Sequence, residues 1–298
     1  MRYAPKTGGE QTQGILYLVL TAVMWSLGGI LIKLVNSNAL AIAGTRSAIA
    51  SLIIWIYLKK PKFTWSAAQI GAALAYTGTV IFFVSANKLT TAANAILLQY
   101  TAPIYVAILG AWLLKEKVKP YDWAAILLTL GGMVLFFIDG LNTSNFMGDV
   151  CALLSGVCFA TFAVFMRMQK HESPLESVLL GNVLTSLIGL PFLTSAMPDA
   201  KGWLGLILLG AVQLGLPYIL YSKAVRHLKA LEIILISTIE LVLNPVLVFL
   251  TIGEVPGTMA FIGGAVILVV ITAWCSLPAI MDRRTNAQDP DSEKANAS

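Results

Sequence analysis

The run LEIILISTIELVLNPVLVFLTI, residues 231–252, has the composition of a membrane-spanning helix, yet it carries the carboxylate of Glu240 near its middle. A charged side chain at the centre of a bilayer costs about 2.5–3.5 kcal/mol on insertion scales. An acid at this depth is tolerated where it faces a polar or hydrated interior of the protein. The run therefore predicts a membrane protein with a polar site near the middle of the membrane.

The composition of the whole chain supports a membrane setting. Hydrophobic residues make up 57% of the 298 residues and charged residues only 12%, whereas soluble globular domains carry roughly 25% charged residues. So much apolar surface cannot be buried in a soluble core of this length. The basic residues that give the net charge of +5 lie between apolar runs. They are interpreted as signals of membrane orientation and not as a nucleic-acid surface.

Ten apolar runs of about 20 residues follow one another along the chain, and each is long enough to cross a hydrocarbon core about 30 Å thick. The connections between them are short and polar. The expected fold class is an all-α integral membrane protein with ten transmembrane helices. The predicted spans are residues 14–35, 38–58, 65–87, 91–114, 121–138, 147–168, 174–196, 202–222, 231–252 and 257–277.

The basic residues near the span ends are distributed unevenly between the two sides of the membrane. If the N-terminus is cytoplasmic, 15 Lys and Arg residues fall on the cytoplasmic side. Only Lys33, Lys88 and Lys201 fall on the other side. Cytoplasmic loops carry an excess of Lys and Arg, so this bias predicts that both termini lie in the cytoplasm.

The two halves of the chain align with each other at nearly constant offsets. Five spans in each half would force the second copy to cross the membrane in the opposite direction. This architecture is typical of secondary transporters, whose substrate site lies at the midplane between the copies. A chance alignment of apolar helices is the alternative. The matched pairs are Gly14/Gly148, Trp25/Phe159 and Lys33/Arg167 at an offset of 134, and Ala86/Ala224, Leu97/Leu235 and Glu116/Glu254 at an offset of 138.

The repeat divides the chain into five parts. We expect an N-terminal cytoplasmic tail at residues 1–13, a first five-helix repeat at 14–138 and a connecting loop at 139–146. An inverted second repeat follows at 147–277. The tail at 278–298 is mostly polar, which predicts a disordered cytoplasmic segment.

Four stretches also resemble a known family, the EamA-type branch of the drug/metabolite transporter superfamily, whose members have ten helices in two five-helix repeats. The family pattern of a proline followed thirteen residues later by a glutamate is matched by Pro103 and Glu116. The second repeat keeps Glu240 and Glu254 but has Leu241 where the family often has proline. The stretches are AVMWSLGGILIK (22–33), AGTRSAIA (43–50), TAPIYVAILGAWLLKEKV (101–118) and IELVLNPVLVFLTIGE (239–254).

The resemblance implies export or exchange of small metabolites, including amino acids, across the bacterial inner membrane. It implies neither an enzyme nor a cofactor. The residues themselves also argue against an enzyme, because His171 and His227 lie at span edges and no span holds a nucleophile–base pair or a metal cluster.

Glu240 shares one helical face with Ser237 and Asn244, which lie three residues before it and four residues after it. Pro245 has no N–H group, so it leaves the carbonyl group of Leu241 without a helical partner. Polar side chains beside a free carbonyl group suit a hydrated cavity and not a lipid-facing surface.

Halving each predicted span places several rings and polar side chains at mid-depth. Trp and Tyr normally gather at membrane interfaces, so their presence at mid-depth indicates a partly hydrated cavity. For any single residue, ordinary helix packing is the alternative. The candidate substrate-binding residues are Trp25, Tyr76, Gln99, Tyr100, Phe159, Phe162, Gln213, Thr238, Glu240 and Asn244.

The charged groups within or beside the spans have alternative roles. Glu240 is expected to pair with a substrate amine or a proton, and a structural acid bonded to neighbouring helices is the alternative. Arg46 is a candidate for pairing with a substrate carboxylate. The alternative, which is favoured, is a structural role in which it holds its helix to a neighbour or snorkels outward to the near membrane interface. The roles of Glu116 and Glu254, at helix ends, stay open.

The expected function is secondary active transport of amino acids or related amphipathic amines by alternating access about the midplane cavity. An alternative substrate class is drug-like cations or other metabolites, which the protein would export. An alternative mechanism is that of a channel-like facilitator. The expected partners are a small-molecule substrate and the lipid bilayer, with proton coupling as a candidate and no nucleic acid. Metals and cofactors are not expected, and either a monomer or a homodimer is compatible with the sequence.

Cysteine substitutions in a cysteine-free background test the predicted orientation. Asn36→Cys, Asn142→Cys and Gly257→Cys should react with a membrane-impermeant thiol reagent outside intact cells, because the first two residues lie in predicted outer loops and Gly257 lies at the outer end of a predicted span. Pro61→Cys lies in a predicted cytoplasmic loop and should be protected. Labelling of Pro61→Cys together with protection of Asn142→Cys would show that the chain is inserted the other way round.

Overall fold

The computed structural model describes residues 8–138, 145–172, 174–195, 197–243 and 257–288. Within these ranges every regular element is a helix and no strand occurs. Most elements are α-helices, while η2 is a 3₁₀-helix and η3 is a π-helix. The elements are α1 (Gly8–Trp25), α2 (Gly28–Leu34), α3 (Ala39–Leu58), α4 (Ala67–Leu89), α5 (Ala92–Gln99), α6 (Ala102–Leu113), α7 (Pro120–Phe137), α8 (Phe146–Met168), α9 (Pro174–Gly189), η2 (Leu190–Ser195), α10 (Ala200–Leu208), η3 (Leu209–Gly215), α11 (Leu216–His227), α12 (Ala230–Ser237) and α14 (Thr258–Gln288).

Eight helical stretches among the described residues are long and apolar enough to cross a membrane, and a ninth, Pro120–Phe136, is apolar but shorter. These stretches overlap nine of the predicted spans. The remaining predicted span, residues 231–252, is described only as far as residue 243. An all-helical fold is thus confirmed for the described residues, and the count of ten spans stays a prediction. The eight stretches are Gly9–Ile32, Ala39–Leu58, Ala67–Leu89, Asn94–Leu113, Phe146–Met168, Pro174–Thr194, Ala200–His227 and Thr258–Cys275.

Short polar side chains fix where several helices begin. Each of these side chains accepts a hydrogen bond from a backbone N–H group in the first turn of the helix that follows. Such caps pair N–H groups that have no partner within the helix. The caps therefore set the starting residue of each apolar segment. The capping residues are Asn38, Ser66, Thr91, Asn145 and Asp199.

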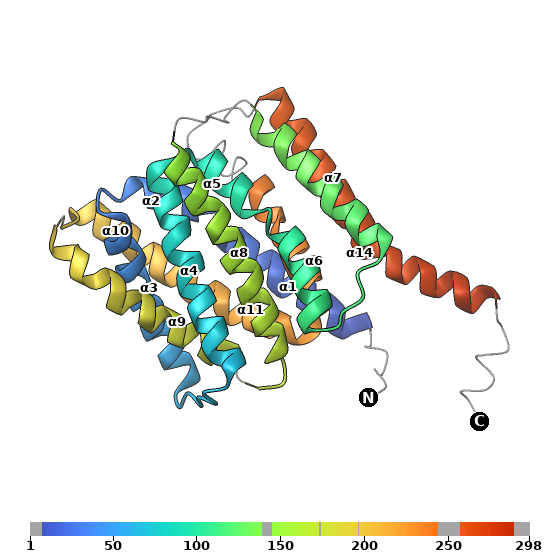
Figure 1. The fold of residues 1–298 in the computed structure, drawn as a ribbon, viewed down its shortest axis with the longest axis horizontal. Coiled ribbons are helices and arrows are strands. Elements are labelled where there is room, and N and C mark those ends of the chain that lie inside the picture. Colours follow the sequence, from blue (N-terminus) through green and yellow to red (C-terminus); the bar gives the residue numbers. More distant parts are fainter. Residues whose placement is uncertain (1–7, 139–144, 173, 196, 244–256, 289–298) are drawn as a thin grey trace.

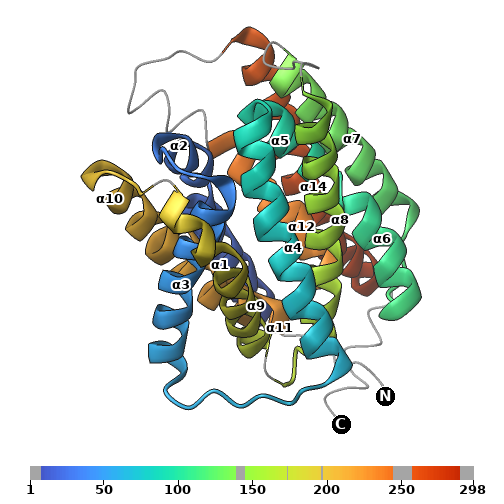
Figure 2. The same ribbon diagram turned by 60° about the vertical axis from the view of Figure 1, so that its left-hand side comes forward.

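The helices form a single bundle in which sequence-distant segments lie side by side (Figures 1 and 2). Helices α4 and α8 pack against each other in the middle of the bundle, and α3 packs against α9 on one flank. On the opposite flank α7 packs mainly against α14. The connections α3–α4 and α8–α9 lie at the same end of the bundle. The first half of the chain thus interlocks with the second.

Two helix crossings bring backbones into direct contact. A Cβ atom on Gly44 of α3 would lie 2.6 Å from backbone atoms of Gly189, at the end of α9. A Cβ atom on Gly156 of α8 would lie 2.7 Å from the carbonyl oxygen of Gln99, at the end of α5. Small residues at such crossings allow membrane helices to approach closely and to gain van der Waals contact.

Helix α14 continues to Gln288, whereas the sequence predicts that the second repeat ends at residue 277 and that a disordered tail begins at 278. Residues 278–288 thus belong to α14, while the division into repeats and tail stays a prediction. Adding residues to an existing helix requires no new nucleation, so a polar segment remains helical when it extends an apolar span. Residues 289–298 of the predicted tail lie outside the described residues.

Substituting Gly44 with alanine tests the α3–α9 crossing. The added methyl group meets backbone atoms, which cannot rotate away, so Gly44→Ala should lower the free energy of unfolding by roughly 1–3 kcal/mol. The matched control is Gly131→Ala on α7, where a Cβ atom would have no neighbour within 4 Å. Thermal unfolding of the two purified variants measures the change in stability that each substitution causes. A Gly44→Ala variant as stable as Gly131→Ala would contradict the crossing.

Candidate functional site

A cavity of about 40 Å³ lies between helices that are distant in the sequence. Its described polar lining consists of Arg46, Thr79, Gln99, Gln213 and Glu240. Its described aromatic lining consists of Trp25, Phe83, Tyr100, Phe159 and Tyr218. An apolar enclosure with a few convergent polar groups is typical of a small-molecule binding site.

Four segments depart from regular α-helix geometry beside this cavity. The helix of α1 and α2 is interrupted after Trp25, and that of α5 and α6 is interrupted at Tyr100. Helix α12 ends at Ser237, and the chain is helical again from residue 239 to residue 243. The π-helix η3 carries Gln213 into the lining. Interrupted membrane helices and π-turns occur preferentially at ligand and ion sites.

Pro103 causes the interruption between α5 and α6. It has no N–H group, so it cannot donate to the carbonyl group of Gln99, four residues earlier. The chain tightens at this point, and the N–H group of Thr101 donates to the carbonyl oxygen of Leu98 at 3.3 Å. The turn places Gln99 and Tyr100 in the cavity lining. The carbonyl group of Gln99, freed by the proline, packs against Gly156 of α8.

Glu240 meets Tyr100 across the cavity. The hydroxyl group of Tyr100 donates to Oε2 of Glu240 at 2.6 Å and also lies 3.1 Å from the carbonyl oxygen of Ser237. Glu240 is 9% exposed, and no basic side chain of the described residues lies within ion-pair distance of it. The acid therefore has a neutral hydrogen-bond donor but no counter-charge among those residues.

Arg46 reaches the cavity from α3. Its Nη1 atom donates to Oε1 of Gln213 at 3.0 Å. On another wall, Nε2 of Gln99 donates to Oγ of Ser155 at 2.8 Å, and that hydroxyl group donates to the carbonyl oxygen of Thr79. Both amide side chains therefore have hydrogen-bond partners in the walls of the cavity.

A group of packed rings includes several of the aromatic residues that line the cavity. Trp25 lies with its ring centroid 5.9 Å from that of Phe159, 5.2 Å from that of Tyr218 and 5.7 Å from that of Tyr221. Tyr76 packs edge-on against Tyr218 at 4.9 Å. Ring pairs at these distances contribute about 0.5–1.5 kcal/mol beyond the area that they bury.

The structure brings most of the sequence-predicted site residues together. Tyr76 and Phe162 pack in the ring group, but the cavity lining does not include them. Thr238 is buried and its hydroxyl group donates to the carbonyl oxygen of Leu235 in its own helix at 2.7 Å. Asn244 lies outside the described residues. The predicted residues that line the cavity are Trp25, Gln99, Tyr100, Phe159, Gln213 and Glu240.

Tyr218 and Arg46 line the cavity although the sequence analysis did not place them in the site. Tyr218 falls near the end of its predicted span, where a tyrosine is usually an interface residue. Pro217 provided a usable signal, because it cannot donate to the carbonyl group of Gln213 and so distorts the helix there. For Arg46 the sequence favours a structural role over pairing with a substrate, yet the residue lines the cavity and bonds to Gln213 there.

The sequence comparisons identify the family. The sequence profile described as the EamA-like transporter family matches residues 12–138 and again residues 146–274. The chain belongs to the EamA-like transporter family. It is therefore a multi-pass membrane transporter and not an enzyme, as the sequence predicts.

Similar proteins of this kind occur in archaea, bacteria and animals. An uncharacterized transporter of Archaeoglobus fulgidus is 26% identical over 86% of this chain and 94% of that protein. The pseudopaline exporter CntI of Pseudomonas aeruginosa is 25% identical over 87% of this chain and 95% of that protein. Human solute carrier family 35 member G1 is 24% identical over 86% of this chain and 76% of that protein. A crystal structure with a TM-score of 0.73 and 19% identity covers 92% of this chain and 99% of its own, which shows a shared fold.

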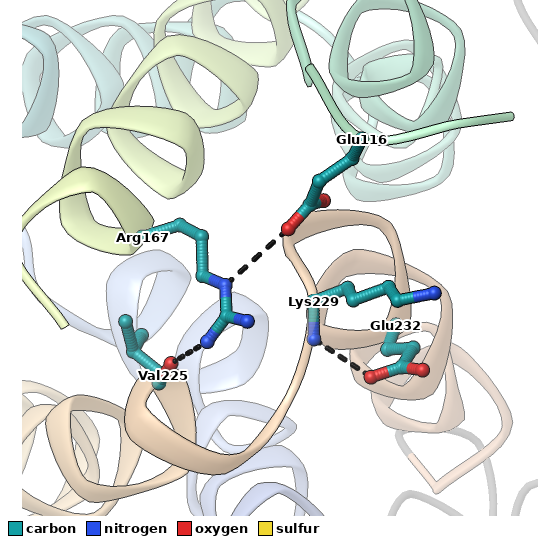
Figure 3. Close-up of polar contacts among 5 residues, drawn as sticks. All are labelled: Glu116, Arg167, Val225, Lys229 and Glu232. Atoms are coloured by element: carbon teal, nitrogen blue, oxygen red, sulfur yellow. Dashed lines mark hydrogen bonds and ion pairs between the residues drawn. The ribbon is translucent and has the colours of Figure 1, made fainter. Parts of the chain in front are cut away.

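Away from the cavity, a buried arginine joins two helices of the transporter and the connection between α6 and α7 (Figure 3). Nε of Arg167, on α8, lies 3.4 Å from Oε1 of Glu116, and its Nη1 atom donates to the carbonyl oxygen of Val225 on α11 at 2.7 Å. Beside this pair, the N–H group of Lys229 donates to Oε2 of Glu232 at 2.7 Å and caps α12. Glu116 thus pairs with a basic residue, while Glu254 lies outside the described residues.

Pro103→Ala tests whether the interruption of α5–α6 belongs to the site. The new N–H group can donate to the carbonyl group of Gln99, so the helix straightens and Tyr100 moves relative to Glu240. Exchange of radiolabelled amino acid, the expected substrate class, should fall at least about tenfold, the factor that corresponds to roughly 1.4 kcal/mol. Thermal stability should not fall, since a backbone hydrogen bond is gained.

The matched control is Pro120→Ala, at the first turn of α7. A proline there replaces an N–H group that has no helical partner, so exchange should be unchanged. If Pro103→Ala and the unmodified protein exchange amino acid at equal rates, the helix interruption is not needed for transport.

Proposed function

We propose that this transporter is a secondary carrier for small amphipathic amines, amino acids in particular, and that it works by alternating access. The observation that carries the proposal is the buried carboxylate of Glu240, which lines an aromatic cavity between interrupted helices and has no basic partner among the described residues. A substrate amine or a proton would supply the missing positive charge.

The lining supports this substrate chemistry. The rings of Trp25, Phe159 and Tyr218 offer apolar faces, which also attract cations. Gln99 and Gln213 add neutral hydrogen-bonding groups. A polyanionic substrate such as a nucleotide sugar would need several basic side chains, whereas Arg46 is the one basic residue in the described lining.

Alternating access is supported by the size of the cavity. A volume of about 40 Å³ is far below the roughly 300–1,000 Å³ of typical small-molecule pockets. A bound substrate therefore requires the helices around the cavity to move apart. The Arg167–Glu116 pair, which lies away from the cavity, ties α8 to the connection between α6 and α7 and would be strained or broken by such a movement.

We further propose ten membrane-spanning helices in two inverted five-helix repeats. The family profile matches the chain twice, which supports two related halves. The helix interruptions at Tyr100 and Thr238 are related by the offset of 138 that aligns the halves. Trp25 and Phe159, related by the offset of 134, pack against each other beside the cavity.

The proposed location is the inner membrane of a bacterial cell with both termini in the cytoplasm. The connections that carry Lys59, Lys60 and Lys170 lie at one end of the bundle, which supports this orientation. The name of the Pseudomonas relative, an exporter, supports outward transport.

Proteoliposomes loaded with radiolabelled leucine or phenylalanine test the proposal. External amino acids and amines should accelerate loss of label in a saturable manner, while sugar phosphates and nucleotide sugars should not. Glu240→Gln keeps the shape and removes the charge, so it should lower exchange at least about tenfold, corresponding to roughly 1.4 kcal/mol. Normal exchange by Glu240→Gln with unchanged pH dependence would contradict the proposed role of Glu240 in transport.

Glu232→Gln is the matched control, because Glu232 belongs to the same predicted span and lies outside the central cavity. A glutamine oxygen can still accept the capping hydrogen bond from the N–H group of Lys229. This variant should exchange normally. Competition by sugar phosphates or nucleotide sugars alone would contradict the proposed substrate, and flux that does not saturate would indicate a channel.

A further inference from the structure

Arg46 is a buried cation without a counter-charge among the described residues. The residue is 1% exposed and lines the same cavity as Glu240. Its Nη1 atom donates to Gln213, but its Nε atom has no hydrogen-bond partner. No carboxylate of the described residues lies within ion-pair distance of the guanidinium group.

An unpaired guanidinium group at this depth is unfavourable in the empty protein. A charge removed from water loses its hydration, and a neutral amide oxygen restores only part of the lost free energy. The guanidinium group carries five N–H donors in a planar fork. The unpartnered Nε–H group leaves one edge of this fork short of an acceptor, and a carboxylate is the group that such a fork binds with two parallel hydrogen bonds.

The surroundings hold Arg46 in place. A Cβ atom on Gly210 would lie 2.7 Å from the carbonyl oxygen of Arg46, so η3 packs directly on the backbone of α3. A Cβ atom on Gly28 would lie 2.9 Å from Nε2 of Gln213. The amide nitrogen of Gln213 is therefore packed against the first residue of α2 while its oxygen accepts from Arg46. A binding group fixed in this way loses little conformational entropy when it captures a ligand.

We propose that Arg46 binds the carboxylate of the substrate, so that the site takes a zwitterionic α-amino acid with its amine at Glu240 and its carboxylate at Arg46. Only the binding of the substrate amine by Glu240 rests on the proposed function; the binding of the carboxylate by Arg46 does not. It reverses the structural role that the sequence favoured for this residue. A snorkelling side chain would end at a membrane interface, whereas this one ends in the central cavity. A purely structural tie to Gln213 would leave the Nε atom unused.

Three matched ligands separate the two halves of the site. Phenylalanine carries both charged groups, phenethylamine lacks the carboxylate, and 3-phenylpropionate lacks the amine. Leucine, isopentylamine and 4-methylpentanoate form a second series. Ligand-induced thermal stabilisation of the purified full-length protein, titrated with each compound, gives an apparent affinity, because a ligand that binds the folded state raises its stability by mass action.

Arg46→Gln should weaken binding of phenylalanine and 3-phenylpropionate by about 10- to 100-fold, the loss expected for hydrogen bonds to a charged group. Binding of phenethylamine should not change. Glu240→Gln should show the opposite pattern, with loss of phenylalanine and phenethylamine and no loss of 3-phenylpropionate. Arg167→Gln removes a buried arginine outside the cavity, so it should lower stability without changing the ratio of the three affinities.

Gln213→Glu provides a second variant in case Arg46→Gln does not fold. The new carboxylate gives Arg46 an internal partner, so the variant should be more stable than the unmodified protein and should bind phenylalanine more weakly relative to phenethylamine. The inference would be overturned if Arg46→Gln and Gln213→Glu changed the affinities for all three ligands by the same factor. It would also be overturned if neither variant changed any of these affinities. Binding of 3-phenylpropionate that depends on Arg46, without any binding of phenethylamine, would support Arg46 and contradict the proposed role of Glu240.

Discussion

A helix in a membrane must pair its own backbone groups, because the hydrocarbon offers them no partner. In the described part of the chain, the segments that depart from regular helix geometry at Trp25, Tyr100, Gln213 and Thr238 converge on one cavity or lie beside it. Protein atoms enclose them there, and packed helices replace lipid around the freed carbonyl groups. The same constraint therefore keeps the outer surface helical and places the irregular, chemically active backbone in the interior.

Each of the two charged groups in this interior is hydrogen-bonded to a neutral side chain. Glu240 is held by the hydroxyl group of Tyr100, and Arg46 is held by the amide oxygen of Gln213. Both partners are neutral, so they orient the charge without cancelling it. The two charged groups do not form an ion pair with each other, although they line one cavity. Charges held in this manner keep most of their attraction for a ligand of opposite sign.

Sequence reasoning located Trp25, Tyr100 and Glu240 at the cavity because a polar or ring side chain at mid-depth is unusual enough to indicate a site. It missed Tyr218 because the depth of a residue was estimated by halving a straight helix, and the π-turn before Pro217 shifts the register of the segment that follows. The orientation of Arg46 depends on packing against η3, which no local pattern encodes. Helix α14 extends past its predicted end because composition describes a segment in isolation and not as the continuation of a helix.

The direct contact between Gly44 and Gly189 couples two helices mechanically. Packed helices slide past each other by small amounts when interdigitated side chains can adjust. At this crossing backbone atoms meet backbone atoms, so sliding would drive the main chains together with no rotamer change to relieve the collision. Helices α3 and α9 are therefore in backbone contact two residues before Arg46, so the position of Arg46 depends on how α9 packs. Under the proposed alternating access, the segment of Glu240 would then have to move more than α3 when the cavity widens.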